Sequence, residues 1–301
     1  MGYICGKEFV FDTIFMGNIW VTGANGQLGQ ELQELASGQD NWYFTDLPEL
    51  DICNREACQD FIEAHQIQTI IHCAAYTAVD RAESDPETTF RTNTQASLQL
   101  ADLARKADAQ LIFISTDYVF DGNSPTPYQE SDPCAPISVY GRSKREAEIG
   151  IQQSGAKGII IRTAWLYSTY GSNFVKTMLR LSEERSEIQV VNDQLGSPTY
   201  AKDLASAIRH ILPQLDKQDF HGEIFHYTNE GCCSWHDLAV LSVQLGKKDC
   251  IIRPIPTTAY PTAAHRPAYS LLSKEKIRTV FGVETPDWKV SLAKFFEKLL
   301  P

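Results

Sequence analysis

The sequence predicts an α/β protein in which a doubly wound parallel sheet is followed by a smaller C-terminal α/β portion. Short apolar strand patterns alternate with helical patterns over most of the 301 residues. The strands are near-continuous apolar runs, which is typical of a parallel sheet that is covered by helices on both faces. The alternation becomes looser after about residue 167. The length suits one large domain or two smaller ones.

The strands expected in the first portion span residues 18–22, 42–44, 69–74, 110–116 and 158–166. The helices expected between them span residues 27–36, 54–65, 87–107 and 138–153. Leu28, Leu32 and Leu35 lie at helical spacing in the first helix, and Asn54 can cap the second. We therefore predict a dinucleotide-binding domain over residues 17–166.

The second portion contains fewer strand patterns. Its expected helices span residues 173–184, 201–212, 234–245, 273–281 and 287–300, and its short strands span residues 188–191 and 223–227. A proline-rich stretch from Pro254 to Pro267 interrupts the helices. We predict a smaller substrate-binding domain over residues 167–301, whose chain crosses back to the large sheet.

Composition and charge limit the classes of partner and the compartment. The formal net charge of −11 weighs against nucleic acid, which binds through Lys and Arg, but not against a small phosphate-bearing ligand. No apolar run approaches the roughly 18 residues that cross a bilayer. The eight cysteines form no C-x-x-C pair, which indicates reduced thiols in the cytoplasm. Residues 1–16 resemble no signal peptide, and we interpret residues 1–15 as an extension before a functional start at Met16.

The first motif is TGANGQLG at residues 22–29, directly after the first expected strand. In this G-x-x-G-x-x-G pattern, Gly23 permits a tight turn, Gly26 lets the backbone approach a pyrophosphate, and Gly29 allows helix and strand to pack closely. The following helix N-terminus offers N–H groups to phosphates. The motif therefore predicts a dinucleotide site on a Rossmann-type sheet.

An acidic residue about 20 positions further along is expected to hold the adenosine ribose. Asp46, at the end of the second strand, is the first candidate and Asp51 is the second. A carboxylate at this place repels a 2′-phosphate, so use of NADH is compatible with the sequence. The sequence does not decide between NADH and NADPH.

The second motif joins Ser115-Thr116-Asp117, at a strand end, with Tyr140 and Lys144. Tyr140 and Lys144 are four residues apart on an expected helix, so they project from one face. A nearby ammonium and an oxidised nicotinamide both favour the phenolate, which should lower the pKa of Tyr140 toward the working range. Thr116 can orient a substrate carbonyl beside Tyr140. These residues predict an oxidoreductase.

From about residue 17 onward the chain resembles the extended short-chain dehydrogenases/reductases, and more closely the dTDP-4-dehydrorhamnose reductases among them. The resemblance rests on eight blocks: GANGQLGQEL (23–32), AAYTAVDRAE (74–83), STDYVFDG (115–122), YGRSKREAE (140–148), RTAWLYS (162–168), NFVKTM (173–178), NDQLGSPT (192–199) and RPAYSLL (266–272). The third, fifth and seventh are the narrower ones. The resemblance implies reduction of the C4 ketone of dTDP-4-dehydro-β-L-rhamnose with NADPH or NADH, which supplies rhamnose for polysaccharides such as lipopolysaccharide.

The resemblance also implies roles for individual residues. Tyr140 would donate a proton to the C4 oxygen, and Lys144 would hold the nicotinamide ribose and tune Tyr140, with Thr116 as the third catalytic residue. The implied cofactor-binding residues are Gly23, Asn25, Gly26, Gln27, Leu28, Asp46, Asp51, Ile52, Ala75, Tyr76, Thr77, Tyr140 and Lys144. The implied substrate-binding residues are Thr116, Asp117, Tyr140, Trp165 and Arg266. Trp165 can pack against a deoxysugar or serve as a core aromatic, and Arg266 can bind the diphosphate or remain a solvated loop residue.

Several alternatives stay open. Another nucleotide-sugar reductase, an epimerase or a dehydratase would share these motifs, and one branch of the fold, the beta subunit of methionine adenosyltransferase, is a regulatory partner. Some relatives are dimers bridged by a divalent metal through acidic side chains. Here Glu31 follows the glycine motif but Lys202 occupies the later stretch, so a bridging Mg²⁺ stays open but the sequence does not favour it. His72, His226 and His236 show no metal-ligand spacing. A monomer or a homodimer is compatible with the sequence.

Overall fold

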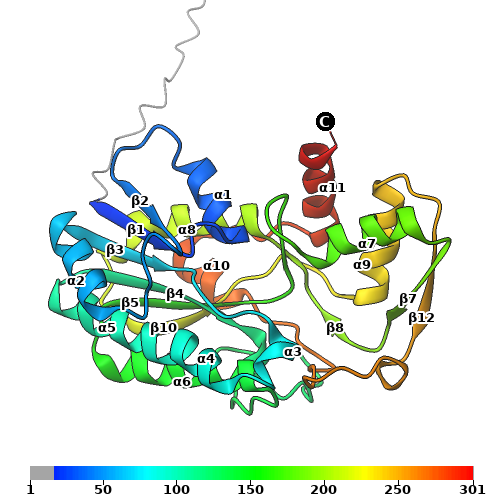
Figure 1. Ribbon diagram of the computed structural model, residues 1–301, viewed down its shortest axis with the longest axis horizontal. Coiled ribbons are helices and arrows are strands. Elements are labelled where there is room, and N and C mark those ends of the chain that lie inside the picture. Colours follow the sequence, from blue (N-terminus) through cyan, green and yellow to red (C-terminus); the bar gives the residue numbers. More distant parts are fainter. Residues whose placement is uncertain (1–16, 301) are drawn as a thin grey trace, which may run out of the picture.

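Six parallel strands form the central sheet of the computed structural model, which describes residues 17–300 (Figure 1). The strands are β1 (Asn18–Thr22), β2 (Trp42–Thr45), β3 (Ile67–His72), β4 (Gln110–Thr116), β5 (Gly158–Thr163) and β10 (His221–His226). Their order across the sheet is β10-β5-β4-β3-β1-β2. This arrangement confirms the predicted doubly wound α/β fold. The predicted extension over residues 1–16 lies outside the described residues.

Helices cover both faces of this sheet, as the apolar strands predict. One face carries α1 (Gln27–Leu35), α8 (Ala201–Leu215) and α10 (Glu275–Phe281). The other face carries α2 (Arg55–Ala64), α5 (Ala96–Lys106) and α6 (Val139–Ser154). Alternation along β1 divides the two cores: Ile19 and Val21 pack toward α1 and α8, whereas Trp20 packs toward α2 and α5. Asn54 caps α2, as predicted, by accepting a hydrogen bond from the Ala57 N–H.

The segment expected as one helix over residues 87–107 contains a change of helical pitch. It comprises α4 (Pro86–Phe90), a π-helical turn (Arg91–Gln95) and α5. Two short helical turns lie next to the strand ends, α3 (Val79–Ala82) after β3 and a 3₁₀ turn (Asp117–Val119) after β4. Wide π turns often occur at functional sites, and both helical turns lie beside the carboxyl edge of the sheet.

A small lobe lies beyond this edge, at the right of Figure 1. We define it as α7 (Phe174–Glu184), β7 (Glu187–Val191), α9 (Trp235–Leu245), β12 (Ile251–Ile255) and α11 (Trp288–Leu299). β7 and β12 pair in parallel, and a 3₁₀ turn (Thr257–Ala259) follows β12. Our prediction lacked β12, because Arg253 and Pro254 interrupt its apolar pattern. Proline is tolerated there because β12 pairs on one side only.

Two short ladders connect the lobe with the large sheet. β6 (Leu166–Tyr167) pairs with β9 (Thr199–Tyr200), and β8 (Leu195–Gly196) pairs with β11 (Cys233–Ser234). Although α8, β10 and α10 follow residue 166 in the chain, they pack on the large sheet or pair with β5. Within residues 17–300, no helix has both the length and the apolarity that a membrane crossing requires.

Candidate active site

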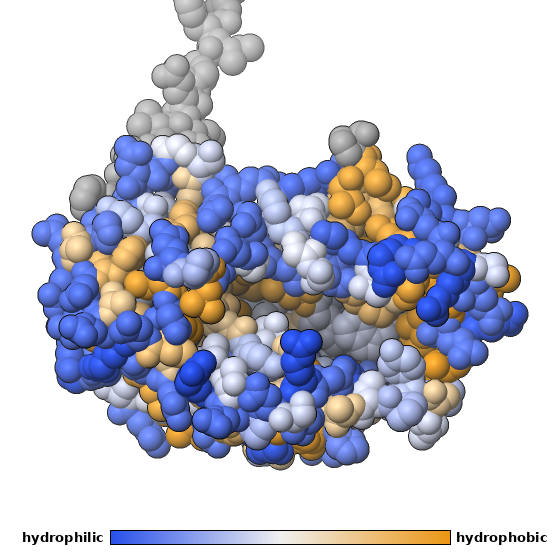
Figure 2. Space-filling model, viewed as in Figure 1, coloured by the Kyte–Doolittle hydropathy of each residue, from blue (hydrophilic) through white to orange (hydrophobic). Residues whose placement is uncertain are grey.

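The carboxyl ends of β1, β3, β4 and β5 open into a cleft with a volume of about 820 Å³. Figure 2 shows this hollow at the centre of the molecule, between the large sheet and the small lobe. Open α/β sheets bind ligands at this edge, and the volume lies within the range of ligand pockets. Of the predicted site residues, all but Asn25 and Arg266 line the cleft.

The turn between β1 and α1 requires glycine at two of its three motif positions. Gly23 has φ +70°, and a Cβ there would lie 2.6 Å from the Ala74 nitrogen. A Cβ at Gly29 would lie 2.4 Å from the Gly23 oxygen. Gly26 is less crowded, because a Cβ added there would lie 3.2 Å from the Gly23 oxygen. Gly26 is also the N-cap residue of α1, where no side chain caps the helix. The first N–H groups of α1 therefore fit a pyrophosphate in the cleft.

Asp46 holds the glycine turn in place and lines the cleft. Its Oδ2 accepts a hydrogen bond from the Asn25 N–H at 2.9 Å, and its Oδ1 accepts one from the Leu47 N–H at 2.8 Å. Asn25 thus meets the site through its backbone, which explains why its side chain is absent from the lining. Asp51 and Ile52 line the same end of the cleft.

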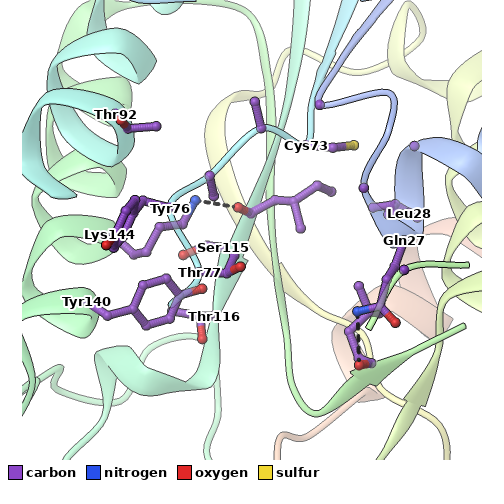
Figure 3. A pocket seen from close by; sticks show the side chains of 18 of the residues that line it. Gln27, Leu28, Cys73, Tyr76, Thr77, Thr92, Ser115, Thr116, Tyr140 and Lys144 are labelled. Carbon is purple, nitrogen blue, oxygen red and sulfur yellow. Dashed lines mark hydrogen bonds between the residues drawn. The ribbon is translucent and has the colours of Figure 1, made fainter. Parts of the chain in front are cut away.

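Tyr140 and Lys144 project from α6 toward β4, on adjacent turns of the helix (Figure 3). Ser138 fixes the start of α6 by accepting a hydrogen bond from the Gly141 N–H at 3.1 Å. Burial raises the pKa of the Tyr140 phenol to about 12, against the effect of a hydrogen bond with Thr116. Figure 3 also shows Gln27 and Leu28 of α1 on the opposite side of the cleft.

The Lys144 ammonium is turned toward the backbone of β4. Its Nζ donates a hydrogen bond to the Ile114 carbonyl at 2.7 Å and lies 3.9 Å from the centroid of the Phe113 ring. Burial lowers the pKa of Lys144 to about 7, and the nearby Glu148 opposes that shift. The pKa of the Tyr140 phenol is thus raised, not lowered as we expected, because burial dominates its environment and the Lys144 Nζ is directed at the Ile114 carbonyl.

Thr116 and Asp117 form a buried polar pair at the end of β4. The Thr116 hydroxyl donates to Asp117 Oδ1 at 3.1 Å, and the Tyr118 N–H donates to the same hydroxyl at 3.2 Å. Asp117 Oδ2 has no hydrogen-bond partner among the residues described. Burial raises the pKa of Asp117 to about 6. Ser270 and Thr116 oppose that shift by hydrogen bonding. A buried carboxyl in the lining of the cleft can still receive a donor from a ligand.

The structure separates the two remaining substrate candidates. Trp165 lines the cleft beyond the end of β5, where φ +49° ends the strand that we expected to reach residue 166. Arg266 instead forms a two-pronged ion pair with Asp80 of α3, at 2.6 and 3.1 Å, and does not line the cleft. The pair lowers the pKa of the Asp80 carboxyl. Binding of a diphosphate by Arg266 stays a prediction.

Known proteins share this arrangement over nearly the whole chain. A family model described as RmlD substrate binding domain matches residues 17–300. The chain belongs to the RmlD substrate binding domain family. The "dTDP-4-dehydrorhamnose reductase" of Aggregatibacter actinomycetemcomitans is 39% identical over 290 residues, which cover 92% of this chain and 97% of that protein.

Two solved structures of RmlD-type proteins agree with the fold. The dTDP-4-dehydrorhamnose reductase of Clostridium acetobutylicum has a TM-score of 0.90 and 38% identity, covering 94% of this chain and all of that one (100%). The dTDP-4-dehydrorhamnose reductase of Bacillus anthracis, solved in complex with NADP, has a TM-score of 0.89 and 38% identity, covering 94% and 99% of the two chains. The predicted family is thereby confirmed.

The cleft of this RmlD-family chain also contains residues that our sequence reasoning missed. Arg91 and Thr92, from the π turn, line it near Asp51. Asn173 lines it from the start of α7 and donates a hydrogen bond to Gln27 Oε1 at 3.0 Å. The block NFVKTM begins at Asn173 and could have drawn attention to it, whereas no sequence pattern marks the π turn.

The residues around Glu31 do not fit a divalent cation. Glu31 is fully buried, accepts a hydrogen bond from the Ser168 hydroxyl at 2.5 Å, and lies 3.3 Å from Lys298 Nζ. Glu34 pairs with Lys298 and with Lys202. Two lysines therefore neutralise the two glutamates. Nowhere in residues 17–300 do three or more His, Cys, Asp or Glu side chains form a group that could hold a metal.

Proposed function

We propose that this chain reduces the C4 ketone of dTDP-4-dehydro-β-L-rhamnose to dTDP-β-L-rhamnose, with NADPH or NADH as the reductant. One observation carries the proposal. Thr116, at the carboxyl end of β4, and Tyr140 and Lys144, on adjacent turns of α6, line the same cleft as the glycine turn. The names of the relatives and the NADP in the Bacillus anthracis structure support the same reaction.

The residues of this chain would divide the chemistry as follows. The N–H groups of Gly26, Gln27 and Leu28 would hold the pyrophosphate of NADPH, which would supply the hydride for the ketone carbon. Tyr140 donates the proton to the C4 oxygen, and Thr116 orients that oxygen by hydrogen bonding. Lys144, whose pKa burial lowers, would hold the nicotinamide ribose one helical turn from Tyr140.

The substrate would lie between β4, β5 and the small lobe. Asp117, with its free Oδ2, would accept a hydrogen bond from a sugar hydroxyl. Trp165 would contact the deoxysugar through the part of its indole that lines the cleft and that Trp235 and Gly196 leave uncovered. Arg266 would reach the diphosphate only after leaving Asp80. We keep residues 17–166 as the cofactor domain and residues 167–301 as the substrate domain of this proposal, with α8, β10 and α10 of the second part returning to the large sheet. The enzyme would work in the cytoplasm as a monomer or homodimer.

The direct test offers the purified chain dTDP-4-dehydro-β-L-rhamnose with NADPH and, separately, with NADH, and follows the absorbance of the reduced nicotinamide. The expected result is decay that depends on the sugar. No decay with either cofactor would overturn the proposal and favour a regulatory subunit. Tightly bound NAD that survives purification would favour an epimerase or dehydratase, because a reductase must exchange its cofactor at every turnover.

A further inference from the structure

Trp165 adopts a backbone conformation that is unfavourable for a tryptophan. Its φ of +49° lies in the left-handed region, where a bulky side chain is strained. Strain of this kind persists only where the surrounding structure enforces it. Trp165 lies two residues after Thr163, which pairs in register with Thr116 across β4 and β5. The strained residue is therefore next to the catalytic candidates.

Three contacts from distant segments hold Trp165 in this conformation. Its ring stacks on Trp235, with ring centroids 3.6 Å apart and planes 12° apart. Its carbonyl accepts a hydrogen bond from the Thr199 N–H at 3.1 Å. Gly196 lies close to another side of the Trp165 indole, since a Cβ added at Gly196 would lie 2.6 Å from Trp165 Cε2. Phe174 supports Trp235 in turn, at a centroid distance of 4.7 Å.

Gly196 and Trp235 are fixed relative to each other by the ladder of β8 and β11. Cys233 pairs with Gly196 and Ser234 pairs with Leu195, and Trp235 follows directly. A capping box locks this corner: the Ser234 N–H donates to the Asp237 carboxylate at 2.9 Å, and the Asp237 N–H donates to the Ser234 hydroxyl at 3.0 Å. The position of Trp235 is thus set by backbone pairing.

A third segment ties the same ladder to the loop that carries Arg266. The Leu195 N–H donates to the Ala268 carbonyl at 2.8 Å, and the Ser270 N–H donates back to the Leu195 carbonyl at 2.8 Å. The blocks NDQLGSPT and RPAYSLL therefore meet beside Trp165. The two segments meet where they support the Trp165 indole, and not beside the residues that carry the reaction.

We propose that Trp235, held by the β8–β11 ladder, is a positioning residue that fixes the plane of the Trp165 indole for binding of the deoxysugar. This inference rests on the proposed function, in which the sugar contacts Trp165. A fixed ring loses no rotamer freedom when the sugar binds, whereas a loose ring must be ordered at that moment. Trp235 should therefore act on sugar affinity and leave the proton-donating residues unchanged.

Trp235→Leu tests this inference with two readouts. The stacked indoles should give an exciton couplet in the far-ultraviolet circular dichroism spectrum, and the variant should lose it. The KM for the sugar should rise about tenfold, the size of an aromatic-pair contribution. The kcat and the dissociation constant of NADPH should stay within about twofold of the parent values. Trp288→Leu is the matched control: Trp288 is buried in the same lobe and does not stack on Trp165, so its variant should keep both couplet and KM.

Gly196→Ala perturbs the indole from its other side and serves if Trp235→Leu does not fold. The backbone of Gly196 is not left-handed, so the added methyl acts through its clashes with Trp165, at 2.6 Å from Cε2, and with Ser270 Oγ at 2.9 Å. It should weaken the couplet and raise the KM for the sugar in the same direction. A folded variant without the couplet but with the parent KM would overturn the inference and leave the proposed function standing. A parent enzyme that reduces no sugar would overturn the proposed function, and this inference with it.

Discussion

The two ends of the cleft are built in different ways. At the cofactor end, the backbone of one short stretch, residues 23–29, is shaped by its own glycines and held by one carboxylate, Asp46. At the sugar end, Trp165 depends on Thr199, Gly196 and Trp235, which lie 31 to 70 residues further along the chain. The glycine turn of the cofactor end is therefore shaped mainly by its own sequence, whereas the position of Trp165 at the sugar end exists only after distant segments have met.

Tyr140→Phe should have the largest effect, and it acts on the chemistry alone. Loss of the proton donor should lower kcat about 10²- to 10⁴-fold, because the phenol is the acid of the reaction. Isothermal titration should show NADPH binding within about twofold of the parent. Tyr43→Phe, on the face of β2 that packs on Phe61, is the matched control and should keep full turnover. A Tyr140→Phe enzyme that binds cofactor and keeps normal turnover would contradict the mechanism.

Gly23→Ala should damage the cofactor end through backbone and packing together. The left-handed φ adds about 1–3 kcal/mol, and the methyl would meet the Ala74 backbone at 2.6 Å. We expect the free energy of unfolding to fall by about 3 kcal/mol or more and NADPH to bind more than about tenfold more weakly. Gly38→Ala is the control, because Gly38 also has a left-handed φ but has no atom within 4 Å of an added Cβ. Equal losses in both variants would show that close packing of the turn is unimportant.

Asp117→Asn should raise stability while lowering activity, as expected at a site where function is kept at the expense of folding. Burial raises the folded-state pKa of Asp117 from 3.8 to about 6. Because the folded value lies above the unfolded one, the ionised carboxylate destabilises the fold above pH 6, and this penalty disappears as pH falls below about 4. Denaturant unfolding should show a gain of up to about 3 kcal/mol near pH 8 and none near pH 3.5.

Asp121→Asn is the matched control for that pH dependence. Asp121 accepts hydrogen bonds from the Asn123 N–H at 3.1 Å and the Tyr128 hydroxyl at 2.8 Å, and the hydrogen bond from the Asn123 backbone lowers its pKa. Its folded-state pKa is depressed, so its carboxylate stabilises the fold above the unfolded pKa and loses that effect as pH falls. The Asp121 variant should therefore be less stable near neutral pH. The same sign for both variants would refute the assignment of Asp117.

Asp46→Ser should have the smallest effect, and it tests which carboxylate contacts the ribose at the cofactor end of the cleft. Removing the carboxylate removes its repulsion of a 2′-phosphate, so the ratio of kcat/KM for NADPH to that for NADH should rise by about tenfold. Steady-state kinetics with both cofactors measure this ratio. Asp51→Ser is the comparison, and a larger change in that variant would move the ribose contact from Asp46 to Asp51.

Sequence patterns alone determined the large sheet, its covering helices and the cofactor turn. Apolar runs and helical spacing report burial and periodicity, which are local properties, and they located β1 and β4 with their observed bounds. The glycine spacing predicts a tight turn at Gly23, and the left-handed φ of +70° there agrees with it. The predicted strand over 158–166 was too long, because the break at Trp165 is imposed by partners outside that segment.

Tertiary structure decided the rest of the site. A two-residue ladder such as β8–β11 is too short to have a periodic pattern, and β12 is disguised by Arg253 and Pro254. The pairing of Arg266 with Asp80 joins residues 186 positions apart, and each looks solvated in its own sequence context. These features depend on contacts that form only when the small lobe docks beside the sheet. Local side-chain chemistry therefore fixes where the cofactor can bind, and long-range packing fixes how the sugar is held.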